Sequence, residues 1–419
     1  MAEALVHLPN APAGPRAWPD DLPLSRVPYW VYQDDATYKA EQARIFEGPN
    51  WNFLCLEVEI PNPGDYRTTH VGQMPVIVVR AQDGTINAFE NRCSHRGSLI
   101  AFDDGGNAKF FKCIYHAWSY DLRGNLQGIA FERGVDGTGG MREPVDKAAI
   151  GPRKLRVTRL NGLVFGTLSS ETPPIEDYLG PDVLGRVRRV LKAPMRVMGR
   201  FTQMLPNNWK LYVENVKDTY HASLLHLFFG TFRITRLTQG GGVFVSENGG
   251  SHASYTTDNA RDTNSTAYRD QGIRTESQYK LKDPSLLDAV NEFGDDIRVQ
   301  ILGIFPGFIL QQISNCLAVR QVLPKAVDRT ELNWVYFGFQ DDTPEMNRRR
   351  LKQQNLVGPA GFVSMEDGCV GGFVQRGIAA AEDRVSVVAM GGHTAESQVT
   401  RATETSVRGF WKAYRRCMT

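Results

Sequence analysis

The spacing of apolar and polar residues predicts mostly strands in the first half of the chain and both strands and helices in the second half. From Val58 to Val157, short apolar runs alternate with turn-prone residues and glycines, which indicates short strands joined by tight turns. Parts of the stretch from Val299 to Phe339 alternate between polar and apolar residues, as long strands with one buried face do. Helical periodicity dominates from Thr343 to Asn355 and at the C-terminus. The pattern therefore predicts a protein with both strands and helices.

The length and composition of the chain limit what it can be. A chain of 419 residues exceeds what one hydrophobic core usually organises, so we expect two domains. A net charge of +2 gives no reason to expect a nucleic acid partner. No apolar run approaches the ~18 residues of a membrane span. The N-terminus, Met1 to Pro23, lacks the basic start and apolar stretch of a secretory signal, so we expect no membrane association and a cytoplasmic protein.

Four residues of types that bind metals form two short pairs, each with one cysteine and one histidine. Cys93-Ser-His95 and Cys113-Ile-Tyr-His116 are separated by seventeen residues, and each pair follows a predicted strand. Two thiolates and two imidazoles could hold zinc, or a two-iron, two-sulfide cluster with the cysteines on one iron and the histidines on the other. Zinc sites usually pair cysteine with cysteine, whereas each pair here is mixed. The spacing therefore favours the cluster.

The residues around these pairs resemble the Rieske motif of the aromatic ring-hydroxylating oxygenases. His95-Arg96-Gly97 and His116-Ala117-Trp118 are similar to that family's flanking residues. The resemblance implies a Rieske [2Fe-2S] cluster held by Cys93, His95, Cys113 and His116. Ferredoxins and respiratory proteins share this motif, so taken alone it supports electron transfer and not oxygenation.

A second group of candidate ligands lies further along the chain. His221 and His226 occur in a segment with helical periodicity, where five residues of regular helix would place them roughly 140° apart. To share one metal, the helix must therefore distort or end between them. An acidic pair, Glu366-Asp367, follows the turn Gly358-Pro-Ala-Gly. Two histidines and a carboxylate form the facial triad of mononuclear iron(II), which leaves positions open for dioxygen.

Both of these segments resemble the same oxygenase family. The resemblance implies that His221, His226 and Asp367 hold iron, because the family's carboxylate ligand falls at the second acidic position. It also implies that Asp218 connects an iron-binding histidine to a Rieske histidine of a neighbouring subunit. A metal-bound imidazole normally gives its second N–H to a carboxylate, which is the physical basis for that role.

The resemblance extends from Arg26 to Trp411 and implies a fold and a division of the chain. The expected class is α+β, with a β-rich Rieske domain inserted in a catalytic domain whose central antiparallel sheet is covered by helices. We expect an N-terminal segment, residues 1–48, packing on the catalytic domain, then the Rieske domain at residues 49–170 and the catalytic domain at residues 171–419. A chain with both centres is expected to be the large subunit of an oxygenase. A Rieske electron carrier without oxygenase activity, or a non-catalytic scaffold subunit, is the alternative from another class.

Two arginines suggest the substrate. Arg320 lies on a largely apolar strand, where a guanidinium needs an anionic partner or a water-filled cleft, although outward snorkelling or a protein carboxylate would also satisfy it. Arg401 stands at the entry to the last helix. Within the family, the chain is most similar to subunits that oxidise terephthalate, and the resemblance implies that Arg320 and Arg401 hold the two carboxylates beside Ser254 and Ile301. The expected product is the 1,2-cis-dihydrodiol; salicylate or anthranilate, with one carboxylate, is the alternative substrate.

The chain contains no glycine-rich dinucleotide fingerprint. Electrons from NAD(P)H are therefore expected to arrive through a separate reductase. The resemblance also implies a small β subunit in an α3β3 assembly.

Overall fold

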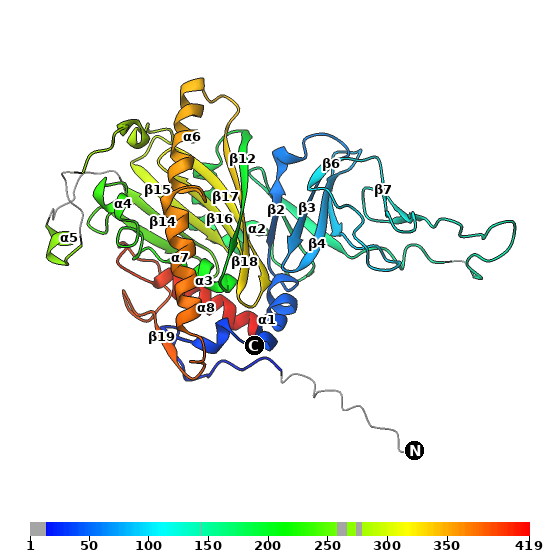
Figure 1. The fold of residues 1–419 in the computed structure, drawn as a ribbon, viewed down its shortest axis with the longest axis horizontal. Helices are drawn as coiled ribbons and strands as arrows, with labels where there is room; N and C mark the ends of the chain where they lie inside the picture. Colours follow the sequence, from blue (N-terminus) through cyan, green and yellow to red (C-terminus); the bar gives the residue numbers. More distant parts are fainter. Residues whose placement is uncertain (1–13, 144, 258–265, 274–278) are drawn as a thin grey trace, which may run out of the picture.

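The computed structural model describes residues 14–143, 145–257, 266–273 and 279–419. The first thirteen residues of the expected N-terminal segment lie outside this part. Two seven-stranded antiparallel sheets dominate the fold, one early and one late in the chain (Figure 1). This is the α+β architecture that the sequence predicts.

The first large sheet is built from strands of the stretch Val58–Val157 and its flanks. Its strand order is β2 (Asn52–Leu56), β11 (Leu163–Thr167), β10 (Lys154–Leu160), β5 (Ile86–Glu90), β4 (Met74–Arg80), β3 (Asp65–Val71) and β6 (Gly105–Asn107). A small sheet of β7 (Phe111–Lys112), β8 (Ser119–Tyr120) and β9 (Leu126–Gly128) packs against it through a common core that includes Phe89, Tyr120 and both Cys93 and Cys113. The two candidate cysteines are therefore held by the core of this unit.

The second large sheet carries the long strands predicted between Val299 and Phe339. Its order is β12 (Met195–Leu205), β18 (Arg329–Phe339), β17 (Cys316–Ala326), β16 (Phe308–Ile313), β15 (Ile297–Ile304), β14 (His252–Thr257) and β13 (Gly241–Val245). Both faces of its middle strands are buried. In β16, Phe308 and Leu310 enter one core while Ile309 and Ile313 enter the other, as the alternation of side chains along a strand requires.

Helices cover both faces of the second sheet. The kinked helix α2 (Ile175–Val190) packs in the core on one face. The opposite face carries α3 (Trp209–Lys217), α6 (Pro344–Val357), α7 (Phe362–Gly377) and α8 (Thr405–Met418). The short helices α4 (Leu227–Thr231), α5 (Ala267–Asp270) and η4 (Pro284–Leu287) lie in the connections. The helices predicted at Thr343–Asn355 and at the C-terminus correspond to α6 and α8.

The described part of the N-terminal segment packs beneath the second sheet beside α8. It contains β1 (Arg26–Pro28), η1 (Tyr29–Tyr32), α1 (Asp35–Glu41) and η2 (Gln42–Phe46), and a further turn, η3 (Glu57–Glu59), follows β2. Strand β1 pairs with β19 (Val385–Val387), and the ring of Trp18 lies 5.2 Å from that of Trp411. In the part of the chain that is described, no helix combines the length and apolarity needed to cross a bilayer.

Candidate metal centres

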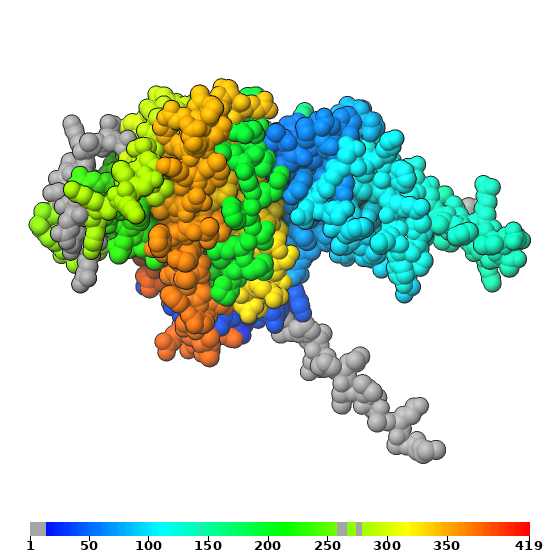
Figure 2. Space-filling model, turned by 45° about the horizontal axis from the view of Figure 1, so that its top comes forward, coloured from blue at the N-terminus to red at the C-terminus, as the bar shows by residue number. Residues whose placement is uncertain are grey.

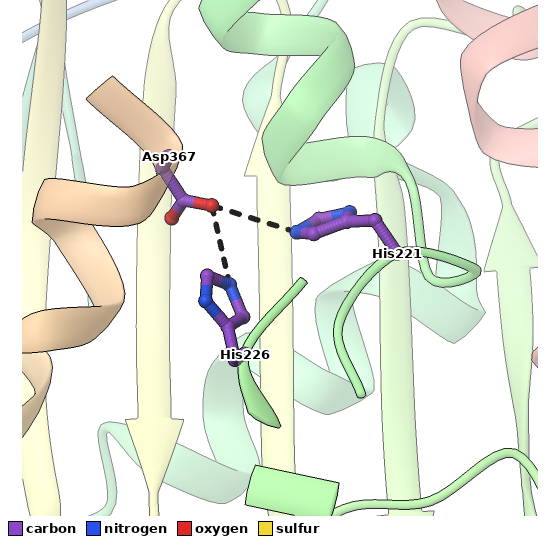
Figure 3. Close-up of side chains that lie close together, drawn as sticks. All are labelled: His221, His226 and Asp367. Carbon is purple, nitrogen blue, oxygen red and sulfur yellow. Dashed lines mark ion pairs between the residues drawn. The ribbon is translucent and has the colours of Figure 1, made fainter. Parts of the chain in front are cut away.

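His221, His226 and Asp367 converge beside the second sheet (Figure 3). One ligand atom from each lies within 4.8 Å of the others. The Nε2 atoms of His221 and His226 lie 3.6 and 3.2 Å from the same oxygen, Asp367 Oδ1. His226 and Asp367 are buried and His221 is half-buried. Two imidazole nitrogens and one carboxylate on a single side of a small space are the donor set that mononuclear iron(II) takes, so the residues fit that metal.

The chain reaches this geometry because helix α3 ends early. The sequence predicts a largely helical segment that distorts or ends between His221 and His226; in the structure α3 stops at Lys217, before both. Asp218 has extended backbone angles, and its Oδ1 accepts a hydrogen bond from Tyr220 N at 2.7 Å. An Asp side chain that bonds the backbone two residues ahead offers a turn in place of another helical turn. His221 therefore lies in an irregular segment, and His226 becomes the N-cap residue of α4.

The second nitrogen of each imidazole also faces a carboxylate. His221 Nδ1 lies 3.2 Å from Asp218 Oδ2, and His226 Nδ1 lies 2.6 Å from Glu366 Oε2. Burial lowers the pKa of His221, but its hydrogen bonds to Asp218 and Asp367 outweigh burial and raise the pKa to about 10. Burial acts to raise the pKa of Asp367, yet the two imidazoles hold it well below its usual range. Both shifts have the same cause, the close approach of the imidazoles to carboxylates, and that group of donors can hold a cation.

The two Cys-His pairs form two turns of the same kind. The amide of each cysteine donates to the carbonyl five residues later, Cys93 to Ser98 and Cys113 to Trp118, at 2.7 and 2.8 Å. In return, the amides of Gly97 and Ala117 donate to the two cysteine carbonyls. Both of these residues have positive φ, which closes each turn tightly. The equal geometry of the turns presents two similar Cys-His pairs towards each other.

The side chains of these turns fit a cluster with two different irons. Cys93 and Cys113 are buried, whereas His95 is exposed and His116 is half-buried. The imidazole centroids of His95 and His116 lie 4.5 Å apart, and His95 stacks on Trp118. Tyr120 Oη donates to Cys93 Sγ at 3.1 Å. Inner thiols and outer imidazoles are the donor arrangement of a Rieske cluster. Sequence reasoning did not find Tyr120, which lies in β8, the strand that follows the turn of Cys113 and His116.

One cavity joins the triad to the predicted substrate residues. The side chains that line it include the triad and Asp218 together with Ser254, Ile301, Arg320 and Arg401. Arg320 and Arg401 thus share one pocket, although they lie far apart in sequence. Ser254 and Ile301 are direct partners in the register of β14 and β15, and Ser254 Oγ donates to Ile301 O at 3.3 Å.

Both arginines are buried, and neither has an acidic partner in the part of the chain that the structure describes. Arg320 is 6% exposed and Arg401 is 4% exposed, so neither snorkels to solvent. Among the described residues, their hydrogen bonds go to neutral acceptors: Tyr212 Oη and Gln311 Oε1 for Arg320, and Thr235 Oγ1 with the Arg236 and Gln239 carbonyls for Arg401. Arg320 also lies 4.4 Å from the centroid of the Trp334 ring. Burial lowers the pKa of Arg401 to about 10. Two uncompensated cations in one cavity favour an anionic ligand.

Comparisons with known proteins agree with this geometry. The family model described as the Rieske [2Fe-2S] domain matches residues 50–137, and that described as the ring hydroxylating alpha subunit (catalytic domain) matches residues 192–419. The chain is 58% identical to the terephthalate 1,2-dioxygenase terminal oxygenase component subunit alpha 2 of Comamonas sp., over 94% of this chain and 95% of that protein. It is 46% identical to the anthranilate 1,2-dioxygenase large subunit of Burkholderia cepacia, over 94% and 93%. A structure of naphthalene 1,2-dioxygenase with indole in its active site superimposes with a TM-score of 0.76 at 25% identity, over 93% of this chain and 91% of that one.

Proposed function

The chain belongs to the alpha subunits of ring-hydroxylating oxygenases, which join a Rieske [2Fe-2S] domain to a mononuclear iron domain, and from this premise we propose that it cis-dihydroxylates terephthalate. Its membership in this enzyme family excludes the electron-carrier and scaffold alternatives. The observation that carries the choice of substrate is a pair of buried arginines in the cavity that also holds the triad. Neither arginine has an acidic partner among the described residues.

We propose that each metal group is held by the residues that converge in its centre. Cys93, His95, Cys113 and His116 hold the [2Fe-2S] cluster, and His221, His226 and Asp367 hold the iron(II). When bound, these groups supply single electrons and an open coordination site for dioxygen. We propose the corresponding division of the chain into residues 1–48, 49–170 and 171–419; the described part of the first segment, from residue 14 on, packs on the catalytic domain.

The protein's contribution to binding is to fix a dianion beside the triad. Arg320 projects from β17 and Arg401 stands before α8, so the two cations reach the cavity from different elements. A guanidinium and a carboxylate form parallel charge-assisted hydrogen bonds, and two such pairs hold a flat para-dicarboxylate at both ends. Ser254 and Ile301 lie on neighbouring strands and line the cavity with them. A para-dicarboxylate held at both ends can turn only about the axis through its carboxylates, and its two long edges are equivalent by symmetry, so equivalent ring atoms face the triad in each turnover.

Anthranilate and salicylate are the alternative substrates within the same reaction class. Each carries one carboxylate, so one of the two arginines would keep an uncompensated charge in the bound complex. Leaving a buried cation without a partner is unfavourable, which disfavours both acids relative to terephthalate. The chain is also more identical to the terephthalate enzyme than to the anthranilate enzyme, which supports terephthalate as the preferred substrate.

Electron delivery is proposed to pass between subunits through Asp218. Its Oδ2 contacts His221, and its carboxylate is 22% exposed, while His95 lies exposed on its turn. The segment that follows β9 projects from the molecule as an arm (Figure 2). On this segment Phe131 is 75% exposed and Val135 is 58% exposed. Such surfaces suit an assembly in which a neighbour's Rieske domain docks near Asp218. We propose an α3β3 oligomer with a small β subunit, supplied by a separate NAD(P)H-dependent reductase in the cytoplasm.

Product formation by the purified protein tests the substrate. The protein, a reductase, NADH and dioxygen are incubated with terephthalate, benzoate, salicylate or anthranilate, and products are identified by mass spectrometry. Wild type should convert terephthalate. Arg320→Leu and Arg401→Leu should each raise the KM for terephthalate roughly 10- to 100-fold, because each removes one charge-assisted pair worth ~1.5–3 kcal/mol. Both variants should keep their iron.

The pattern across the four acids separates the possible results. Turnover of terephthalate that falls in both variants supports the clamp by two arginines. Preference for salicylate or anthranilate, with Arg401→Leu unaffected, would keep the oxygenase and remove Arg401 from the substrate site. Arg188→Leu, on the surface of α2 and paired with Glu176, is the matched control and should leave KM unchanged.

A further inference from the structure

Glu366 precedes the proposed iron ligand Asp367 and makes a contact with His226, another proposed ligand. We infer that Glu366 is a positioning residue for the mononuclear iron: it accepts the Nδ1–H of His226 and so turns Nε2 of that ring towards the metal. The inference rests on the proposed iron ligands, His221, His226 and Asp367.

Two consecutive residues of α7 hold the two nitrogens of one imidazole. Glu366 Oε2 lies 2.6 Å from His226 Nδ1, and Asp367 Oδ1 lies 3.2 Å from His226 Nε2. The side chain of His226 is 3% exposed, so the ring has no solvent to which a misdirected nitrogen could turn. Glu366 and Asp367 therefore define both the orientation of the ring and which nitrogen faces the metal position.

The tautomer follows from these contacts. An ionised carboxylate accepts hydrogen bonds and donates none, so Nδ1 must carry a proton to bond Glu366. In a neutral imidazole the other nitrogen, Nε2, then keeps its lone pair free for a metal. A negative acceptor also increases the electron density on the ring, which raises the basicity of Nε2 as a ligand.

The second imidazole shows the same arrangement with a different acid. His221 points Nε2 at Asp367 and Nδ1 at Asp218, at 3.6 and 3.2 Å. Each proposed iron histidine thus has its own carboxylate behind it, Asp218 for His221 and Glu366 for His226. The contact made by Glu366 is the shorter of the two.

The two carboxylates differ in what else they hold. Asp218 gives its other oxygen to Tyr220 N, which fixes the turn after α3. The side chain of Glu366 is 30% exposed, so its carboxylate reaches from the surface of α7 to the buried ring of His226. If Glu366 were apolar, the buried Nδ1–H of His226 would lose this acceptor. The unsatisfied donor would destabilise the folded protein, and the preference for the metal-binding tautomer would weaken.

Iron affinity, measured on the full chain with its cluster loaded, tests the inference. Glu366→Ala removes the acceptor, and Glu366→Gln keeps the size and an acceptor oxygen but removes the charge. Mononuclear iron(II) affinity is measured by competition with a chromophoric chelator, and the visible absorption of the [2Fe-2S] cluster reports on the fold in each sample. Loss of such an outer partner typically weakens metal affinity about 10- to 100-fold, so we expect this for Glu366→Ala and a smaller but clear loss for Glu366→Gln.

Three further variants make the results decisive. Glu345→Gln, on the neighbouring helix α6 and paired with Arg349, is the matched control and should bind iron as wild type does. His226→Ala should lose the iron and marks the full effect. If Glu366 acted through packing alone, Glu366→Gln would bind iron as tightly as wild type, and Glu366→Asp would bind it more weakly than Glu366→Gln. An affinity of Glu366→Ala within twofold of wild type would overturn the inference while leaving the iron site intact. A wild-type chain that retained no mononuclear iron would instead refute the proposed ligands.

Discussion

The surroundings of a single ionisable residue can shift its pKa in a way that the pattern of the sequence does not reveal. Glu214, in the middle of α3, accepts hydrogen bonds from Tyr32 Oη at 2.9 Å and from Trp411 Nε1. Burial is the largest influence on this carboxyl and raises its pKa to about 7, above the usual 4.5, even though both hydrogen bonds act in the other direction. The half-buried Glu214 should therefore hold its proton more tightly than an exposed carboxyl does.

The raised pKa of Glu214 predicts a stability difference that depends on pH. Because the folded state holds this proton more tightly than the unfolded state, the proton's contribution is complete below pH 4.5 and is lost as pH rises to about 7. Glu214→Gln removes this dependence. The difference between the thermal midpoints of the variant and wild type should therefore change in favour of the variant from pH 5 to 7 and stay constant above pH 7. Differential scanning fluorimetry across this range measures it. Parallel curves from pH 5 upwards would show that Glu214 has an ordinary pKa in the fold.

At the scale of elements, helix α3 is the part that connects the N-terminal segment, the second sheet and the C-terminal helix. Lys210 Nζ lies 2.6 Å from Glu41 Oε1, and both side chains are fully buried. The same carboxylate accepts hydrogen bonds from Trp209 Nε1 at 2.7 Å and Tyr414 Oη at 2.6 Å. These contacts fix α3, and the end of α3 in turn determines where Asp218 and His221 lie.

Removal of one charge from this buried pair should be costly. Lys210→Met leaves the Glu41 carboxylate in the core without its cation, which typically costs ~3–5 kcal/mol. We expect the urea midpoint of unfolding to fall accordingly. Mononuclear iron should be lost at a lower urea concentration than in wild type, because α3 is no longer held by the Lys210–Glu41 pair. The double variant Glu41→Gln and Lys210→Met removes both charges and should recover part of the loss. If the single and double variants were equally unstable, the charge left behind would not be the cause.

At the scale of the whole molecule, the two candidate centres are separated within one chain. Strand β7, which leads into the turn of Cys113 and His116, lies at the far side of the first sheet, whereas α3, α4 and α7 lie against the second sheet (Figure 1). His226 precedes α4 and Asp367 belongs to α7, so the triad lies with the second sheet. The two units contact through Gln321 of β17, whose Nε2 donates to Phe53 O at 2.8 Å and Thr69 Oγ1 at 3.0 Å. Electron transfer within a single chain would have to cross both units, which is why we propose transfer to a neighbour.

The proposed bridge predicts a variant that separates metal binding from turnover. Asp218→Asn keeps the size of the side chain and its bond to Tyr220, so the iron affinity should fall as it does for Glu366→Gln, but both metal groups should remain when iron(II) is supplied in excess, as measured by three irons per chain. NADH-coupled oxygenation should be abolished, because a neutral amide no longer pairs with two imidazoles. Reduced protein mixed with dioxygen and substrate in a stopped-flow instrument should show the cluster remaining reduced. Retained coupled turnover would refute the bridge, and the exposed control Asp177→Asn should behave as wild type.

The sequence determined by itself the parts of this protein that depend on residue type at short spacing. Cys93 with His95, Cys113 with His116, and the pair His221 and His226 lie within a few residues of each other, so each local set could be identified without coordinates. The long strands from Val299 to Phe339 and the helices α6 and α8 were predicted from periodicity, because alternate burial leaves a regular pattern.

Only the tertiary structure decided how these sets combine. The end of α3 at Lys217, the shared cavity of Arg320 and Arg401, and the contact between Glu366 and His226 join residues from different elements. Periodicity reports which face of an element is buried and not what packs against it. A buried arginine is identical in sequence whether it pairs with an acid or faces a cavity, so its role is settled by the long-range contacts that the folded chain makes.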